Sequence, residues 1–180
     1  MTSIASFTLL TAFSSSIHEG NPAAVVFLDD LNLPTATFAG IARNLNQPMT
    51  AFLSVRPFPS GNEKTAAFGV RWFTPTGWES PVCGHASLAA AQAVFERSDL
   101  VSEKVEAIEL HTLTHGIVTA RKAEGGFIEI QLTAGDVEEV SQSEKDKLSE
   151  VLAKAFGRAV VIEYVGKGGK GFEHCKIPND

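Results

Sequence analysis

The sequence is poor in cysteine, and it has no apolar run near the roughly 20 residues that span a bilayer. Cys83 and Cys175 are its only cysteines, and neither stands in a CxxC or Cys/His cluster. We therefore expect neither a disulfide framework nor a zinc site. The low cysteine content favours a reducing, cytoplasmic setting. No Lys or Arg precedes Arg43, so a signal peptide would lack its positive start. We therefore expect no membrane association.

Positive charge is also scarce. The 180 residues contain 15 Lys and Arg against 21 Asp and Glu, which gives a formal net charge of -6. A nucleic-acid partner needs a basic footprint, so we expect none. The glycine- and lysine-rich run Gly166–Gly171 lacks the spacing of a phosphate-binding loop, and we interpret it as a turn or tail. Neither a metal nor an organic cofactor is indicated, and the expected ligand is a small molecule.

The pattern of apolar residues predicts many short strands and few helices. A strand alternates its side chains between two faces, whereas a helix repeats every three to four residues. Thr74–Cys83, with two prolines and a glycine, is expected to be irregular. The predicted strands are Ile4–Phe13, Ala23–Leu28, Thr50–Val55, Ala66–Phe73, Val105–Leu113, Ile117–Arg121, Phe127–Leu132 and Ala159–Val165; the predicted helices are Ala36–Leu45, Gly84–Phe95 and Ser143–Phe156.

The predicted helix Gly84–Phe95 is apolar on nearly every side and rich in alanine. Such a helix is buried among other elements. Short strands around one buried helix indicate an α+β fold, in which a small β-barrel or strongly curled sheet wraps around that helix.

Cys83, Gly84 and His85 stand together where this helix begins. The first N–H groups of a helix lack internal partners and carry the positive end of its dipole, so they can bind a carboxylate or an oxyanion. Gly84 would let a ligand approach the backbone, and the helix end should lower the pKa of the Cys83 thiol. His85 could donate a hydrogen bond or move a proton. The alternative is structural: Cys83 is a small core residue, and His85 caps its own helix.

Several motifs resemble the PhzF-like isomerases of the diaminopimelate epimerase and proline racemase superfamily. They are Gly20-Asn21-Pro22-Ala23-Ala24-Val25-Val26, Arg71-Trp72-Phe73-Thr74-Pro75, Glu79, and Cys83-Gly84-His85-Ala86-Ser87-Leu88-Ala89. The resemblance implies a fold of two similar halves, each a barrel-like sheet around a central helix, with the active site between them. It implies substrate-binding roles for Asn21, Met49, Gly84 and Ser87, and catalytic roles for Cys83 and His85.

The resemblance also implies two kinds of proton-transfer chemistry. In related epimerases two cysteines face each other across the cleft, and Cys83 matches the first of them. In PhzF-like isomerases a glutamate just before the strand Thr50–Val55 is the acid/base instead, and Met49 stands in its place here. Methionine cannot transfer a proton, so this chain departs from the family pattern at the catalytic position.

The chain is short for a fold of two halves. We expect residues 1–135 to form the first half, and residues 136–180 to form the start of a second half with a polar tail. A homodimer could recreate the missing symmetry, with two Cys83-Gly84-His85 segments facing one cleft. We expect an isomerase or epimerase of secondary metabolism that moves a proton on a small carboxylate-bearing metabolite. The alternative is a non-catalytic binding protein, or a specialised biosynthetic protein, that has lost the glutamate base.

Overall fold

The computed structural model describes residues 6–16, 18–55, 62–132, 137–168 and 172–176. The chain divides into two compact units, residues 1–133 and 134–180, and each is described by itself. The first unit contains β1 (Ser6–Ala12), β2 (Asn21–Leu28), α1 (Thr35–Leu45), β3 (Met49–Ser54), β4 (Thr65–Phe73), β5 (Glu79–Ser80), α2 (Gly84–Phe95), β6 (Ala107–His111), β7 (Ile117–Lys122), a single 3-10 turn (Glu124–Gly126) and β8 (Ile128–Gln131).

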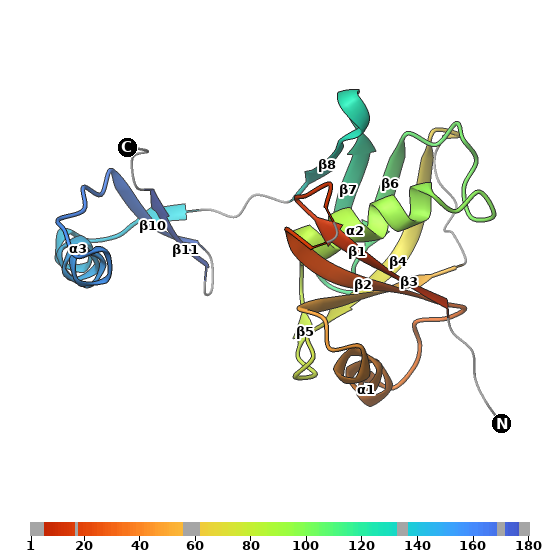
Figure 1. Ribbon diagram of the computed structural model, residues 1–180, viewed down its shortest axis with the longest axis horizontal. Helices are drawn as coiled ribbons and strands as arrows, with labels where there is room; N and C mark the ends of the chain where they lie inside the picture. Colours follow the sequence, from red (N-terminus) through yellow and green to blue (C-terminus); the bar gives the residue numbers. More distant parts are fainter. Residues whose placement is uncertain (1–5, 17, 56–61, 133–136, 169–171, 177–180) are drawn as a thin grey trace. The chain divides into compact units, whose positions relative to one another are not determined.

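The first unit is one curled sheet with a helix on each face. Its strands follow the order β1-β2-β3-β4-β6-β7-β8, and β5 pairs with β4. The pairs β2–β3 and β4–β6 are parallel, and the others are antiparallel. Figure 1 shows α2 on the concave side of the sheet and α1 on the other side. The expected α+β sheet around a central helix is therefore observed.

Alternate residues of the central strands pack against different helices, as the period of a strand requires. In β2, Val25 belongs to the core around α2, whereas Val26 packs in a second cluster with Phe38 of α1. Five alanines of α2 are buried in the larger core: Ala86, Ala89, Ala90, Ala91 and Ala93. Their small side chains let the backbone of α2 approach the concave face. This explains why the helix has few large residues.

Gly20, in the turn between β1 and β2, is required by the backbone. Its φ is +83°, and a Cβ would lie 2.4 Å from the Ala12 carbonyl oxygen. Gly126 has a similar φ of +80°, but a Cβ there would have no neighbour within 4 Å. The glycine of the Gly20-Asn21-Pro22 motif is thus explained by close packing of the turn.

We therefore predict that Gly20→Ala destabilises the protein more than Gly126→Ala does. The strained φ alone costs about 1–3 kcal/mol, and both variants should show this. Only Gly20→Ala must also shift the backbone near Ala12, so its loss of stability should be larger. Chemical denaturation measures this difference in the free energy of unfolding. Equal losses of stability in the two variants would mean that the turn around Gly20 accommodates the added Cβ without further cost.

The second unit contains β9 (Val137–Glu139), α3 (Gln142–Phe156), β10 (Tyr164–Gly168) and β11 (Phe172–Lys176), with sheet order β11-β10-β9. The predicted helix is confirmed, and it starts with a capping box in which Ser141 and Glu144 bond each other's backbone. It ends at Gly157, whose φ is 67°. None of the described helices is long and apolar enough to cross a membrane.

The sequence did not predict the strands described in the second unit correctly. The strand predicted at Ala159–Val165 lies instead at Tyr164–Gly168, and β9 and β11 were not predicted. A Cβ on Gly166 would lie 2.4 Å from Val137 Cγ1, so glycine serves close strand packing here rather than a turn. Residues 169–171 of the glycine-rich run, residues 4–5, and most of the predicted loop Pro57–Lys64 lie outside the described residues.

Candidate functional site

The predicted site residues come from segments that meet at one end of the curled sheet. Asn21 begins β2 and Met49 begins β3; these strands are parallel, and Ala23 is paired with Met49. Cys83 precedes α2, and its side chain shares the larger core with Met49. The structure therefore brings the starts of β2, β3 and α2 to the same end of the sheet.

Cys83 and His85 form a direct side-chain pair at the amino end of α2. Cys83 has an extended backbone, which turns the chain into the helix, and its Sγ lies 3.3 Å from His85 Nδ1. Cys83 is 8% exposed. His85 is half-buried, and its other nitrogen, Nε2, is buried without a hydrogen-bond partner among the described residues. A buried polar atom without a partner is uncommon, and a ligand reaches Nε2 only if the side chain moves, because the atom is buried in this structure.

Both members of the pair are held in their neutral forms. Burial raises the pKa of the Cys83 thiol above its ordinary value, and the backbone N–H of Ala86 opposes this only in part. Burial lowers the pKa of His85, against a smaller opposite effect of the Pro22 carbonyl. The prediction of a lowered thiol pKa was therefore wrong, because desolvation of the thiolate outweighs the helix end. The resting pair is a thiol and a neutral imidazole.

We predict that Cys83 reacts slowly with iodoacetamide near neutral pH. The thiolate is the reactive form, and a raised pKa leaves little of it below about pH 8.5, the ordinary range of a thiol. In a Cys175→Ser background, the alkylation rate should rise steeply only above that range. A fast plateau that extends into mildly acid pH would instead indicate a thiolate–imidazolium pair.

Ser87 and Gly84 have different surroundings. The Ser87 side chain is fully buried, and its hydroxyl donates a hydrogen bond of 2.7 Å to the Cys83 carbonyl. A ligand cannot reach it in this structure, so its contacts support positioning of Cys83 rather than substrate binding. A Cβ on Gly84 would make only ordinary contacts, 3.6 Å from Ile130 Cδ1 and 4.0 Å from Leu132 Cδ1. Packing of the first unit therefore does not require glycine at this position.

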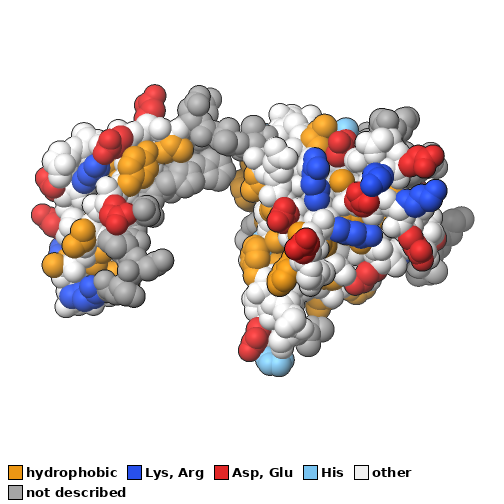
Figure 2. All heavy atoms as spheres, turned by 90° about the horizontal axis from the view of Figure 1, so that it is seen from above, with side chains coloured by type: hydrophobic (Ala, Val, Ile, Leu, Met, Phe, Trp, Pro, Cys, Tyr) orange, Lys and Arg blue, Asp and Glu red, His pale blue; other side chains and the backbone are white. Residues whose placement is uncertain are grey.

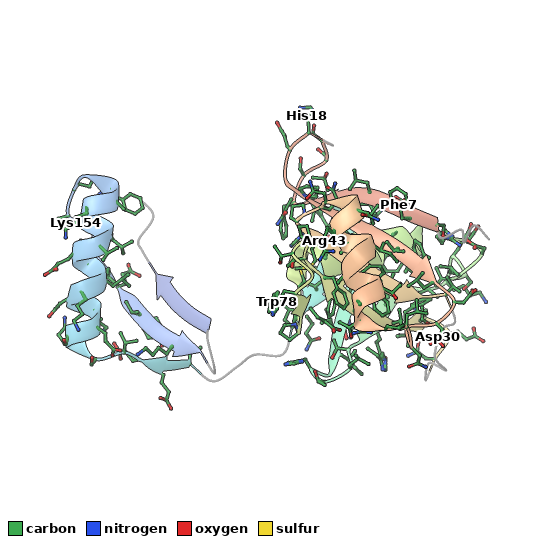
Figure 3. All side chains as sticks on the ribbon, turned by 90° about the horizontal axis from the view of Figure 1, so that it is seen from below. Phe7, His18, Asp30, Arg43, Trp78 and Lys154 are labelled. Carbon is green, nitrogen blue, oxygen red and sulfur yellow. The ribbon has the colours of Figure 1, made fainter. Side chains whose placement is uncertain are left out.

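Met49 is 7% exposed and Asn21 is half-buried. Met49 thus contributes an apolar wall where the family resemblance places a glutamate. His18 is exposed, and its Nδ1 lies 2.9 Å from Ser16 Oγ. Figure 3 shows it at the tip of the loop between β1 and β2.

Two surface grooves of the first unit lie away from the Cys83–His85 pair. One has a volume of about 270 Å³ and is lined by residues that include Trp72, Ser80 and Thr112–His115. The other, of about 620 Å³, adjoins it at Val70, Thr112 and Leu113. Sequence reasoning missed both, because they form where loops meet on folding. The amino end of α2 lines neither of these two grooves.

The carboxylate of Glu79, one of the motif residues, forms an ion pair with Arg71. Both of its oxygens accept hydrogen bonds of 2.7 Å from Arg71, which is stacked on Phe38 with its guanidinium carbon 4.3 Å from the ring centre. The Arg71 side chain is 8% exposed. Glu79 therefore anchors the outer face of the sheet. Among the described residues no three metal-ligating side chains come together.

The model of one protein family, described as phenazine biosynthesis-like protein, matches residues 10–171. The chain belongs to this family. The family resemblance suggested by the sequence motifs is thus confirmed.

Similar proteins carry the same family name or are named isomerases. A human phenazine biosynthesis-like domain-containing protein is 36% identical over 118 residues, which are 65% of this chain and 38% of that protein. A Pseudomonas aeruginosa protein named an uncharacterised isomerase is 41% identical over 102 residues, 57% of this chain and 35% of that protein. These alignments span well under half of each relative's length.

Solved structures confirm the fold assignment. A Bacillus anthracis protein of the PhzF family superposes with a TM-score of 0.68 over 99% of this chain and 57% of its own, at 24% identity. A predicted epimerase from Pseudomonas aeruginosa gives a TM-score of 0.66 over 96% of this chain and 58% of its own, at 22% identity. The chain thus has the fold of PhzF-like and epimerase-like proteins and spans little more than half the length of these structures.

Proposed function

We propose that this PhzF-like chain is part of an isomerase that moves a proton on a small carboxylate-bearing metabolite. The observation that carries the proposal is the Cys83–His85 pair at the amino end of α2, with His85 Nε2 buried and unpartnered. The isomerase name of the Pseudomonas relative supports the reaction class. Localisation in the cytoplasm and a place in secondary metabolism are part of this proposal.

The helix end binds the acid. The N–H groups of Gly84 and His85, at the start of α2, donate hydrogen bonds to the substrate carboxylate, which the helix dipole also stabilises. Asn21 and Met49 border this position and orient the substrate. The carboxylate becomes an enediolate when the neighbouring carbon loses its proton, and the same donors stabilise that charge.

Cys83 and His85 move the proton. Cys83 Sγ passes its hydrogen to His85 Nδ1 and takes the proton from the substrate carbon, so the thiol is restored while the imidazole becomes positive. The electron pair of the broken C–H bond passes into the enediolate, to which His85 Nε2 donates a hydrogen bond. The Cys83 thiol then gives its proton to another carbon of the conjugated anion, and Cys83 Sγ regains a proton from His85 Nδ1, which completes the isomerisation and restores the neutral imidazole. This role follows from the short distance between the two side chains.

A second protein surface over the amino end of α2 would complete the site. A homodimer, expected from the sequence, would supply it by bringing a second copy opposite the first. Burial on that side would exclude water and strengthen the hydrogen bonds to the anion.

Solvent deuterium exchange tests the proposal. A set of amino acids and unsaturated carboxylic acids is incubated in D₂O with the protein, and loss of proton signals is followed by NMR. At least one acid should exchange, and Cys83→Ala and His85→Ala should each slow this by about 10²–10⁴-fold. His18→Ala changes an exposed loop histidine and should keep the wild-type rate. Equal exchange by all four proteins would refute the catalytic role.

A second candidate function is ligand binding without turnover, and Met49 favours it. An apolar side chain stands where the family resemblance places the base, so the pocket could hold an acid that it does not convert. In that case a carboxylate should raise the melting temperature of the wild type without any deuterium exchange. Loss of this shift in Cys83→Ala or His85→Ala would place the ligand at the same helix end.

A further inference from the structure

We propose that Ile130 and Leu132 form a hydrophobic wall that selects the acid bound at the amino end of α2. The selected acid is a monocarboxylate with an uncharged alkyl group next to its carboxylate, and a second charge on the acid is disfavoured. This inference rests on the proposed function, because it takes the helix end as the position of the substrate carboxylate. Neither residue belongs to the motifs that indicate the site.

The end of β8 lies beside the first residue of α2. Figure 1 shows this strand next to the amino end of the helix. A Cβ on Gly84 would lie 3.6 Å from Ile130 Cδ1 and 4.0 Å from Leu132 Cδ1, which are ordinary contact distances. Because glycine leaves this position open, a carbon atom of a ligand can take it and contact both methyl groups without moving either side chain.

The hydrophobic wall is partly open. Ile130 packs against the core around α2, and Leu132 follows two positions later, on the same side of the chain. Ile130 is half-buried, whereas Leu132 is 45% exposed. Removal of apolar surface from water is favourable, so covering Leu132 contributes to binding. An alkyl group of an acid held at Gly84 would cover it.

The other side of the site offers no partner for a second charge. Met49 is apolar and shares the larger core with Cys83. Burial and backbone hydrogen bonds account for the pKa shifts of Cys83 and His85, and no charged side chain among the described residues contributes to them. The helix end stabilises one carboxylate, but an ammonium group would lose its water without gaining a counter-charge. The site therefore favours an acid with a single charge.

Amide NMR titrations of the whole chain with three probes test the selectivity. Isocaproate has the carbon skeleton of leucine without its amino group, free leucine adds the ammonium group, and acetate lacks the alkyl group. Isocaproate should bind about 10-fold more tightly than either of the others, because apolar contacts of this size discriminate by that factor. Its largest shifts should fall on the amides of Gly84 and His85.

Two alanine variants locate the hydrophobic wall. Leu132→Ala should weaken isocaproate binding by about 10-fold and leave acetate binding unchanged, because acetate does not reach the wall. Leu113→Ala is the matched control, since Leu113 is 71% exposed and lines the two grooves instead. It should bind isocaproate like the wild type. The comparison of the three probes on the wild type needs no variant, so it decides the matter if Leu132→Ala does not fold.

Three results would each overturn the inference. They are binding of free leucine or acetate as tight as that of isocaproate, an equal effect of Leu132→Ala on isocaproate and acetate, and no shift at Gly84 and His85 with isocaproate. Deuterium exchange decides the proposed function separately. Selective isocaproate binding without exchange of any acid would refute the isomerase and leave the hydrophobic wall. Exchange in a protein that binds the three probes equally would do the reverse.

Discussion

Glu79→Ala should destabilise the protein by about 3–5 kcal/mol, the usual cost of leaving a buried charge without its partner. The Arg71 guanidinium is 8% exposed, and Glu79 binds it through both carboxylate oxygens. Without Glu79 the cation keeps one close side-chain partner, the Thr35 hydroxyl at 3.2 Å, which carries no charge. The loss is measured as the change in the free energy of unfolding by urea.

Two further variants separate charge from packing. Arg71→Met combined with Glu79→Ala removes both charges and retains an apolar side chain against Phe38 and Phe73, so most of the stability should return. Glu106→Ala breaks the Lys64–Glu106 pair, whose side chains are 68% and 61% exposed, and should cost at most about 1 kcal/mol. If Glu79→Ala costs no more than Glu106→Ala, Glu79 does not anchor the sheet and becomes available as a functional residue.

Met49→Glu should raise the rate of solvent deuterium exchange by about 10²–10⁴-fold, the usual contribution of a positioned acid/base. Position 49 begins β3 beside β2 and shares the core with Cys83, and the family resemblance places a glutamate there. Because Met49 is 7% exposed, burial should raise the pKa of the new carboxyl towards neutrality, which suits proton transfer. The same burial should lower the stability of the fold.

Met49→Gln is the matched control for this gain of activity. Glutamine has nearly the size and polarity of the carboxyl group but cannot move a proton, so it should leave the exchange rate at the wild-type level. Equal rates in Met49→Glu and Met49→Gln, with both variants folded, would show that position 49 does not face the reacting carbon. The Cys83–His85 pair would then have to account for any exchange without help from this position.

The features that sequence could predict are those that repeat locally. The small residues of Gly84–Phe95 indicate a buried helix, and alternation in β4 indicates a strand, because burial on a face leaves a periodic pattern. Boundaries differ from the prediction by one or two residues, as at Met49 and Ala107.

The features that sequence could not predict depend on contacts between distant segments. Val160, Val161 and Ile162 favoured a strand by composition, but pairing selected Tyr164–Gly168, whose glycine lets Val137 approach. The raised pKa of Cys83 could not be foreseen either, because it depends on how deeply the thiol is covered. The ion pair between Arg71 and Glu79 also depends on such a contact, because the register between β4 and β5 brings the two residues together.

One face of the first unit carries charges of both signs, and it therefore offers a carboxylate no single basic patch. On the face shown in Figure 2, acidic and basic side chains lie among one another. An acid that binds this protein is therefore expected to depend on directed N–H groups rather than on a basic surface.

The most direct measurement is a backbone amide NMR titration of the whole chain with a small carboxylic acid that exchanges or protects the fold. If the amino end of α2 binds the carboxylate, the largest shifts should fall on the amides of Gly84 and His85, and the His85 ring should shift with them. Shifts confined to Thr112–His115 and the other residues of the two grooves, with none at Gly84–Ala86, would contradict the account.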